Sequence, residues 1–156
     1  MTILEKNIME ILTPLVGAKA WGPRVLVGSF IHLEFGEPRP YERDTSIMRG
    51  NWVLLTQLCE WRLEKDGNLL IGSENLRENI NVALQELNGS ILQKVDVQLP
   101  TLDTTLFFMN GVILRIFTVS FLRDNMHWVL YLPEDYQVLE VGPGKTWRLI
   151  NDANAK

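Results

Sequence analysis

Residues 105–121 read TLFFMNGVILRIFTVSF, and this stretch decides the fold class. Two apolar segments flank the dipeptide Asn110-Gly111. This dipeptide is the strongest short signal for a β-hairpin, because the favoured two-residue turn needs a positive φ at both central positions. The sequence therefore predicts a pair of antiparallel strands at this place in the chain.

Segments on both sides of the hairpin also have the composition and alternation that are typical of strands. These segments are 24–35, 52–63, 91–99, 126–132, 137–141 and 147–150. Segment 52–63 begins apolar on both of its faces, which favours a central position covered by a helix or by a second layer.

The first predicted helix covers residues 2–16. Thr2 and Glu5 form a capping box, in which each side chain satisfies a backbone N–H that the helix leaves unpaired. Apolar residues then recur at the spacing of one helical face. Pro14 lacks an N–H group, so we expect the helix to stop or kink just before it.

The second predicted helix covers residues 74–88, with Ser73 as its N-cap and Gly89 as its left-handed end. Two helices among many strands indicate an α+β fold. We expect a mostly antiparallel β-sheet or meander on which both helices pack.

The chain of 156 residues is the length of one domain, so we expect a single domain over residues 1–156. Residues 36–50 form a long loop in this prediction. Loops of this length are usually functional or disordered, and a mobile hairpin extension is the other interpretation. Residues 151–156 are expected to be a disordered tail.

Charge and cysteine content limit the partners and the compartment. Lys and Arg number 15 against 19 Asp and Glu, which gives a net charge of −4 and disfavours nucleic acid as a partner. The apolar runs are too short for a membrane span, so we expect no membrane partner. The single cysteine, Cys59, fits a reducing compartment, and we expect a cytoplasmic protein.

Motifs for common chemistries are incomplete in this sequence. Residues 142–146 read GPGKT but lack the earlier glycine and the following helix of a phosphate-binding loop. His32 and His127 are the only histidines, and neither has a partner at metal-ligand spacing. We therefore expect no metal, no cofactor and no catalytic residue, and whether the protein is an enzyme stays uncertain, with non-enzyme favoured.

Candidate binding residues fall into two groups. His32 and Glu34 lie on one strand face, two residues apart, and could act with Glu60 as polar groups in a ligand pocket. The candidates for contact with a partner are aromatic and basic residues in or near the long loop. These residues are Arg39, Tyr41, Arg43 and Trp61.

Five short segments of the N-terminal part carry a family resemblance. They are WGPR (21–24), GSF (28–30), EFG (34–36), RGNW (49–52) and CEWR (59–62). In these segments the chain resembles small uncharacterised bacterial domains of unknown function. The resemblance implies a bacterial source but no activity and no role for any residue.

Three functions are compatible with these features. The first is a non-catalytic protein-binding module, immunity-like or regulatory, which contacts another protein through residues 36–50 or a sheet edge. The alternative is a small-molecule-binding protein or modest enzyme, with a pocket between sheet and helix. The third is self-association into a homo-oligomer through uncovered strand edges.

Overall fold

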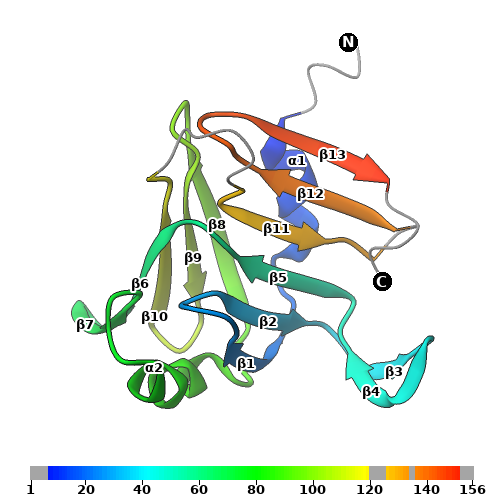
Figure 1. Ribbon diagram of the computed structural model, residues 1–156, viewed down its shortest axis with the longest axis horizontal. Coiled ribbons are helices and arrows are strands. Elements are labelled where there is room, and N and C mark those ends of the chain that lie inside the picture. Colours follow the sequence, from blue (N-terminus) through cyan, green and yellow to red (C-terminus); the bar gives the residue numbers. More distant parts are fainter. Residues whose placement is uncertain (1–6, 120–125, 134–135, 152–156) are drawn as a thin grey trace.

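Two antiparallel sheets stand on either side of a shared hydrophobic core (Figure 1). The computed structural model describes residues 7–119, 126–133 and 136–151. The expectation of a mostly antiparallel fold with two short helices is confirmed, and strands make up much more of the structure than helices do.

One sheet has six strands, in the spatial order β1, β2, β5, β11, β12, β13. Its strands are β1 (Ala20–Val25), β2 (Ile31–Phe35), β5 (Trp52–Thr56), β11 (Trp128–Tyr131), β12 (Gln137–Val141) and β13 (Trp147–Asn151). Each neighbouring pair in this sheet is antiparallel.

The other sheet has five strands, in the order β7, β6, β10, β9, β8. Its strands are β6 (Glu60–Lys65), β7 (Asn68–Gly72), β8 (Leu92–Gln98), β9 (Asp103–Phe108) and β10 (Val112–Phe117). The predicted Asn110-Gly111 hairpin joins β9 to β10. Gly111 alone takes a positive φ, +84°, and Asn110 instead accepts a hydrogen bond from the Val112 N–H with its side chain, at 3.2 Å.

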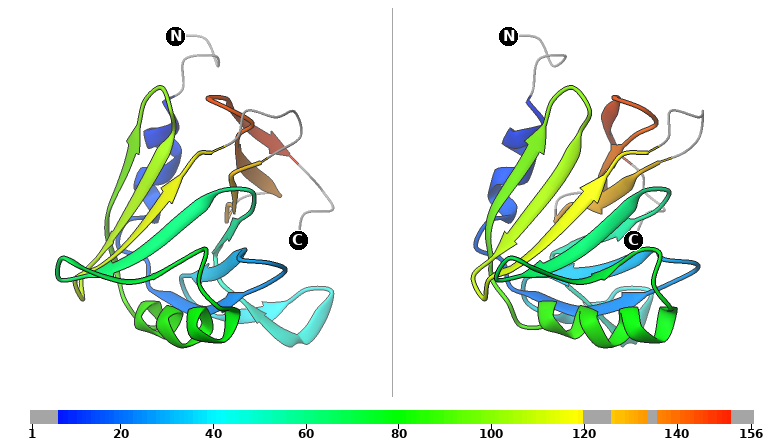
Figure 2. Two further views of the ribbon diagram at one scale, coloured as in Figure 1. Left: turned by 60° about the vertical axis from the view of Figure 1, so that its left-hand side comes forward. Right: turned by 90° about the vertical axis from the view of Figure 1, so that its left-hand side faces the viewer.

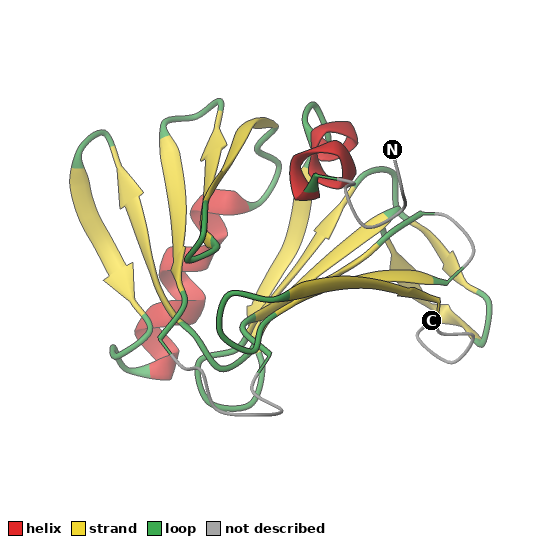
Figure 3. Cartoon of the chain, turned by 90° about the horizontal axis from the view of Figure 1, so that it is seen from above, coloured by secondary structure: helices red, strands yellow, loops and turns green. Residues whose placement is uncertain are grey.

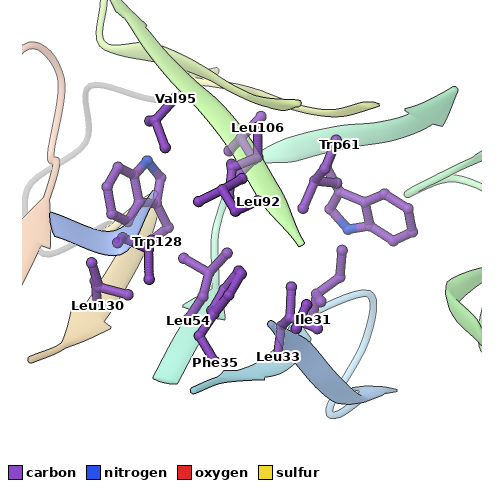
Figure 4. Close-up of a cluster of buried hydrophobic side chains, with 14 of the residues drawn as sticks. Ile31, Leu33, Phe35, Leu54, Trp61, Leu92, Val95, Leu106, Trp128 and Leu130 are labelled. Atoms are coloured by element: carbon purple, nitrogen blue, oxygen red, sulfur yellow. The ribbon is translucent and has the colours of Figure 1, made fainter. Parts of the chain in front are cut away.

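Alternate residues of the two sheets meet in the core (Figure 4). Trp61, Leu92 and Leu106 of the five-stranded sheet lie opposite Phe35 and Leu54 of the six-stranded sheet (Figure 4). Because strand residues point alternately to opposite faces, each sheet also has an outer face that is turned away from this core.

The prediction of long strands over 24–35 and 52–63 is wrong. A turn at residues 26–30 separates β1 from β2, with Gly28 at a φ of +61°. Residues 57–59 separate β5 from β6, and these two strands belong to different sheets. The alternation of apolar and polar residues does not reveal either break, because several turn residues are apolar and continue the strand pattern. These residues are Leu26, Val27, Phe30 and Leu58.

The first helix is shorter than predicted. Helix α1 covers Ile8–Leu12, and a 3-10 turn, η2, continues over Thr13–Leu15 through Pro14. Its N-cap is Asn7, whose side chain accepts a hydrogen bond from the Met9 N–H at 3.0 Å. The expected capping box of Thr2 and Glu5 lies outside the described residues.

The second helix also begins later than predicted. Helix α2 covers Arg77–Leu84 and continues as the 3-10 turn η3 (Gln85–Leu87). Leu76 occupies the N-cap position. Ser73, the predicted cap, instead accepts a hydrogen bond from the Trp61 N–H, at 3.2 Å, because β6 passes beside it.

The two helices do not pack together on one sheet. Helix α1 stands between the sheets and contributes buried apolar side chains to the core (Figure 3). Helix α2 lies across the end of the structure, against β1 of one sheet and β7 of the other (Figure 2). The sheets already cover each other's inner faces, so the helices close the openings between them. Neither helix has the length and hydrophobicity needed to cross a bilayer.

Residues 36–50, predicted as a long loop, contain a separate two-stranded hairpin of β3 (Arg39–Tyr41) and β4 (Asp44–Arg49). This hairpin projects beyond the ends of β2 and β5 (Figure 1). Its side chains are exposed or half-exposed, and none belongs to the core. The final predicted segment, the tail at 151–156, lies outside the described residues except for Asn151, which ends β13.

Candidate functional site

A pocket of about 470 Å³ opens where the β3–β4 hairpin meets the outer face of the six-stranded sheet. Its lining combines three tyrosines, two arginines and several apolar side chains. The lining residues are His32, Arg39, Pro40, Tyr41, Glu42, Arg49, Gly50, Asn51, Val53, Leu55, Tyr131, Pro133 and Tyr136. We call this space the hairpin pocket.

The sheet side of the hairpin pocket is set by strand register. His32 of β2 lies directly opposite Leu55 of β5. Val53 of β5 lies between Glu34 of β2 and Tyr131 of β11. Since these residues alternate with core residues such as Leu54, they share the outer face of the sheet, where the hairpin residues approach them.

His32 places an unusual group at the pocket. The residue is 7% exposed, and its Nδ1 atom has no hydrogen-bond partner among the described residues. Its Nε2 atom lies 4.0 Å from Oε1 of Glu34, beyond hydrogen-bond distance. Burial, together with the nearby guanidinium groups of Arg24 and Arg49, lowers the pKa of His32 to about 4. The imidazole is therefore neutral at physiological pH.

Glu34 is a buried acid that joins the sheet to the hairpin. Its Oε2 accepts a hydrogen bond from the Gly50 N–H at 3.3 Å, and its Oε1 lies 3.5 Å from Nη1 of Arg49. Burial raises the pKa of Glu34, and the contacts with Gly50, Arg49 and Arg24 oppose that rise. The carboxyl group thereby holds the base of the hairpin against β2.

Gly50 permits a close approach at the same place. A Cβ atom at this position would lie 2.4 Å from the carbonyl oxygen of Phe35. That distance is too short for a real contact, so a side chain would force the hairpin base away from β2. Glycine therefore lets the Gly50 N–H reach Glu34.

The hairpin side of the pocket is cationic and aromatic. Arg39 and Arg49 are directly paired across the β3–β4 ladder, and both line the pocket. The guanidinium carbon of Arg49 lies 5.3 Å from the centroid of the Tyr41 ring, a cation–π distance. Arg39 has no ion pair or hydrogen bond from its side chain within the described part of the chain.

The structure brings together some of the candidate residues and separates others. His32, Arg39 and Tyr41 line the hairpin pocket, and Glu34 lies beside His32. Arg43 is an exposed residue between β3 and β4 and does not line the pocket.

The other two candidates lie away from the pocket. Glu60 belongs to β6 in the other sheet, where its carboxylate accepts a hydrogen bond from the Ser73 hydroxyl. Trp61 is 2% exposed in the core, and its indole N–H donates to the Ser29 carbonyl at 2.7 Å. Its side chain therefore offers no surface to a partner.

The position of the pocket also differs from the expectation of a site between sheet and helix. The hairpin pocket lies between a sheet and a hairpin. Where α1 meets the two sheets, the free space is only about 10 Å³, because apolar side chains fill it. The five-stranded sheet covers the inner face of the six-stranded sheet, so only the outer face of the six-stranded sheet has room for a ligand among the described residues.

Sequence reasoning missed several pocket residues, including Arg49, Val53, Leu55, Tyr131 and Tyr136. Arg49 was detectable as part of the charged segment 36–50, but its position opposite Arg39 depends on the hairpin register. Tyr131 comes from a strand far along the chain. Only the pairing of β5 with β11 places it beside Val53.

The other residues that could take part in catalysis or metal binding, His127 and Cys59, are buried in the structure. Both ring nitrogens of His127, a fully buried residue, lie near carbonyl oxygens, 3.1 Å from Gly144 and 3.4 Å from Leu58. Burial raises the pKa of the Cys59 thiol to about 12, which leaves it protonated and unreactive. In the described ranges, no three or more His, Cys, Asp or Glu residues are grouped to hold a metal.

No protein-family model matches the chain, and the searches of curated proteins and of solved structures also found no match. The function of this protein must therefore be inferred from its own residues and geometry.

Proposed function

We propose that this protein binds a small organic molecule in the hairpin pocket and holds it without changing it chemically. The observation that carries the proposal is the hairpin pocket, which brings two arginines, three tyrosines and the neutral imidazole of His32 to one opening on the outer face of the sheet. These side chains come from the β3–β4 hairpin and from distant parts of the chain, so the fold gathers them at one place. Guanidinium, phenol and imidazole groups can each hydrogen-bond to a bound molecule.

The size and lining of the pocket support the same function. Sites for small molecules typically have volumes of ~300–1,000 Å³ and combine apolar walls with a few polar groups. The hairpin pocket, at about 470 Å³, has the apolar residues Val53 and Leu55 on its sheet side and arginines on its hairpin side. His32 and Glu34 are too far apart for the hydrogen bond that a base and its orienting carboxylate would share.

A screen of small molecules by saturation-transfer NMR tests the proposal. Leu55→Trp places a large side chain in the pocket, whereas Ile150→Trp places one on the same outer face but outside the pocket lining. We expect compounds that bind the wild type and Ile150→Trp but not Leu55→Trp. If Leu55→Trp does not fold, Val53→Phe provides a smaller obstruction of the same pocket.

Two results would contradict the proposal. One is a screen in which no compound binds the wild-type protein. The other is a set of bound compounds whose affinity is unchanged in a folded pocket-filling variant, because those compounds would then bind elsewhere.

Protein binding is a second candidate function, favoured by the projecting hairpin. Ile47 and Met48 are adjacent apolar residues of β4 and are 37% and 43% exposed. Such residues could contact a protein in a regulatory or immunity-like role. A defined partner should lose its affinity for the Ile47→Asp, Met48→Glu variant and keep it for Leu99→Asp, which alters another exposed apolar residue.

We place either function in a bacterial cytoplasm. The free thiol of Cys59 supports a reducing compartment, since the chain has no second cysteine with which it could form an internal disulfide.

A further inference from the structure

We propose that the ligand of the hairpin pocket carries a single carboxylate group on an apolar, preferably planar body. The carboxylate is held between Arg39 and Arg49, and the body lies against the outer face of β5. This inference rests on the proposed binding function and adds the chemical class of the ligand.

Two positive charges face each other across the hairpin ladder. Arg39 and Arg49 are direct partners in the β3–β4 ladder, so their side chains share one face of the hairpin, and both line the pocket. Like charges directly opposite each other on paired strands are destabilising. An anion between the two guanidinium groups would turn this repulsion into attraction.

The two arginines of the pocket differ in their ion pairs. Arg49 has a carboxylate partner in Glu34, at 3.5 Å, whereas Arg39 has no ion pair in the described part of the chain. Glu42 adds a further acidic group at the exposed rim of the pocket. Glu42 forms no ion pair with either arginine in the described ranges, so Arg39 is the pocket arginine that lacks an ion-pair partner, which matches a ligand with one negative charge. A doubly charged phosphate would meet repulsion from Glu34 and Glu42.

The shape of the anionic group agrees with this charge. An arginine presents paired N–H donors in a plane that matches the two oxygens of a carboxylate. Arg49 is already positioned by Glu34 and by the Tyr41 ring, so little side-chain freedom is lost when it binds. Arg39 can then approach the carboxylate from the opposite strand.

The body of the ligand is specified by the rest of the lining. Val53 and Leu55 supply an apolar surface, and the rings of Tyr41, Tyr131 and Tyr136 favour contact with a flat molecule. The imidazole of His32 adds a further neutral ring to this lining.

Three compounds with the same naphthalene body test the inference by isothermal titration calorimetry at low ionic strength. They are 2-naphthoate, which has one negative charge, 2-naphthalenemethanol, which is neutral, and 2-naphthyl phosphate, which has two charges near neutral pH. We expect 2-naphthoate to bind at least about tenfold more tightly than each of the other two, a difference of ~1.4 kcal/mol.

Matched variants connect this preference to the arginine pair. In Arg39→Gln, we expect 2-naphthoate to bind about tenfold more weakly while 2-naphthalenemethanol is unaffected. Lys145→Gln removes one positive charge from an exposed turn residue outside the pocket and should change neither affinity. Both substitutions lie outside the core, so their folding can be checked by circular dichroism before the titrations.

The results separate this inference from the function on which it rests. Equal binding of the carboxylate and the alcohol, or tighter binding of the phosphate, would overturn the carboxylate inference and leave the pocket as a binding site. Failure of 2-naphthoate to bind at millimolar concentration would also overturn it. The compound screen with Leu55→Trp and Ile150→Trp decides the binding function independently.

Discussion

His32 combines burial, a missing hydrogen bond and two cationic neighbours. Burial and the guanidinium groups of Arg24 and Arg49 each disfavour a positive charge on the imidazole, and together they lower its pKa to about 4 from an ordinary value of 6.5. A neutral ring can donate with one nitrogen and accept with the other, which suits hydrogen bonding to an uncharged part of a ligand.

This pKa predicts a pH-dependent stability. As the pH falls from about 6.5 to about 4, the unfolded chain binds a proton at His32 that the folded protein excludes. The contribution of this group is therefore complete above about pH 6.5 and is lost as the pH falls to about 4, by at most ~3 kcal/mol. Urea unfolding across this range should show the loss in the wild type, relative to His32→Gln.

The wild type must be compared with His32→Gln because Glu34 has the opposite effect on the pH dependence of stability. Its raised pKa means that the folded protein takes up a proton more readily than the unfolded chain, which stabilises the fold on acidification. That contribution is present in both proteins and cancels in the difference. A constant difference between wild type and His32→Gln across the range would contradict the assigned environment of His32.

The β3–β4 hairpin is the element on which the pocket depends. In the part of the chain that the structure describes, its two strands pair only with each other, and none of its side chains belongs to the hydrophobic core. It is joined to the sheet through Glu34, which contacts Arg49 and Gly50 at the hairpin base. The hairpin therefore supplies side chains to the pocket and none to the core.

Replacement of residues 39–48 by a short Gly-Ser linker tests whether the hairpin is needed for ligand binding but not for folding. Arg49 and Gly50 stay in place, so the contacts of Glu34 are kept. We expect the free energy of unfolding to change by no more than ~1 kcal/mol, because loop length alone has a small effect on stability. Calorimetry should show that the affinity for 2-naphthoate falls by at least about tenfold, since Arg39 and Tyr41 are lost.

A large drop in the urea midpoint would show that the hairpin stabilises the sheets. Undiminished binding by the shortened protein would show that the ligand lies elsewhere. Either result would contradict the role assigned to this element.

At the scale of the whole molecule, two sheets bury their inner faces against each other. Adjacent residues of β5 therefore have different surroundings: Leu54 is 3% exposed in the core, and Leu55 lies at the hairpin pocket on the outer face. Both residues are leucines in the same strand, so their own chemistry does not distinguish them. The packing of the two sheets decides which of them is buried in the core.

Alanine substitutions at these two positions test the arrangement. Leu54→Ala leaves a cavity in the core and should lower the free energy of unfolding by ~2–5 kcal/mol. Leu55→Ala removes the same atoms from a half-buried site beside an open pocket, so we expect less than half of that loss. Urea unfolding of both variants measures the difference, and equal losses would contradict the observed orientation of β5.

Much of the local structure could be predicted from the residues. The Asn110-Gly111 hairpin, the helix within 74–88 and the shared strand face of His32 and Glu34 depend on turn chemistry and on periodicity over a few positions. The N-cap of α2 could not be predicted, because it depends on a neighbour that is distant in sequence, the β6 strand whose Trp61 N–H uses Ser73. The breaks within 24–35 and 52–63 could not be predicted because their apolar turn residues continue the strand alternation.

Local periodicity and turn residues in the sequence determined that this chain forms antiparallel strands with two short helices. The sequence also offered His32, from its strand face, and Arg39 and Tyr41, from the long loop, as candidate binding residues. The tertiary structure decided that the strands divide into two sheets and that these candidate residues meet at a hairpin. The physical reason is range: alternation records which residues share a strand face, whereas the pairing of strands and the choice of the inner face arise from contacts across the whole chain.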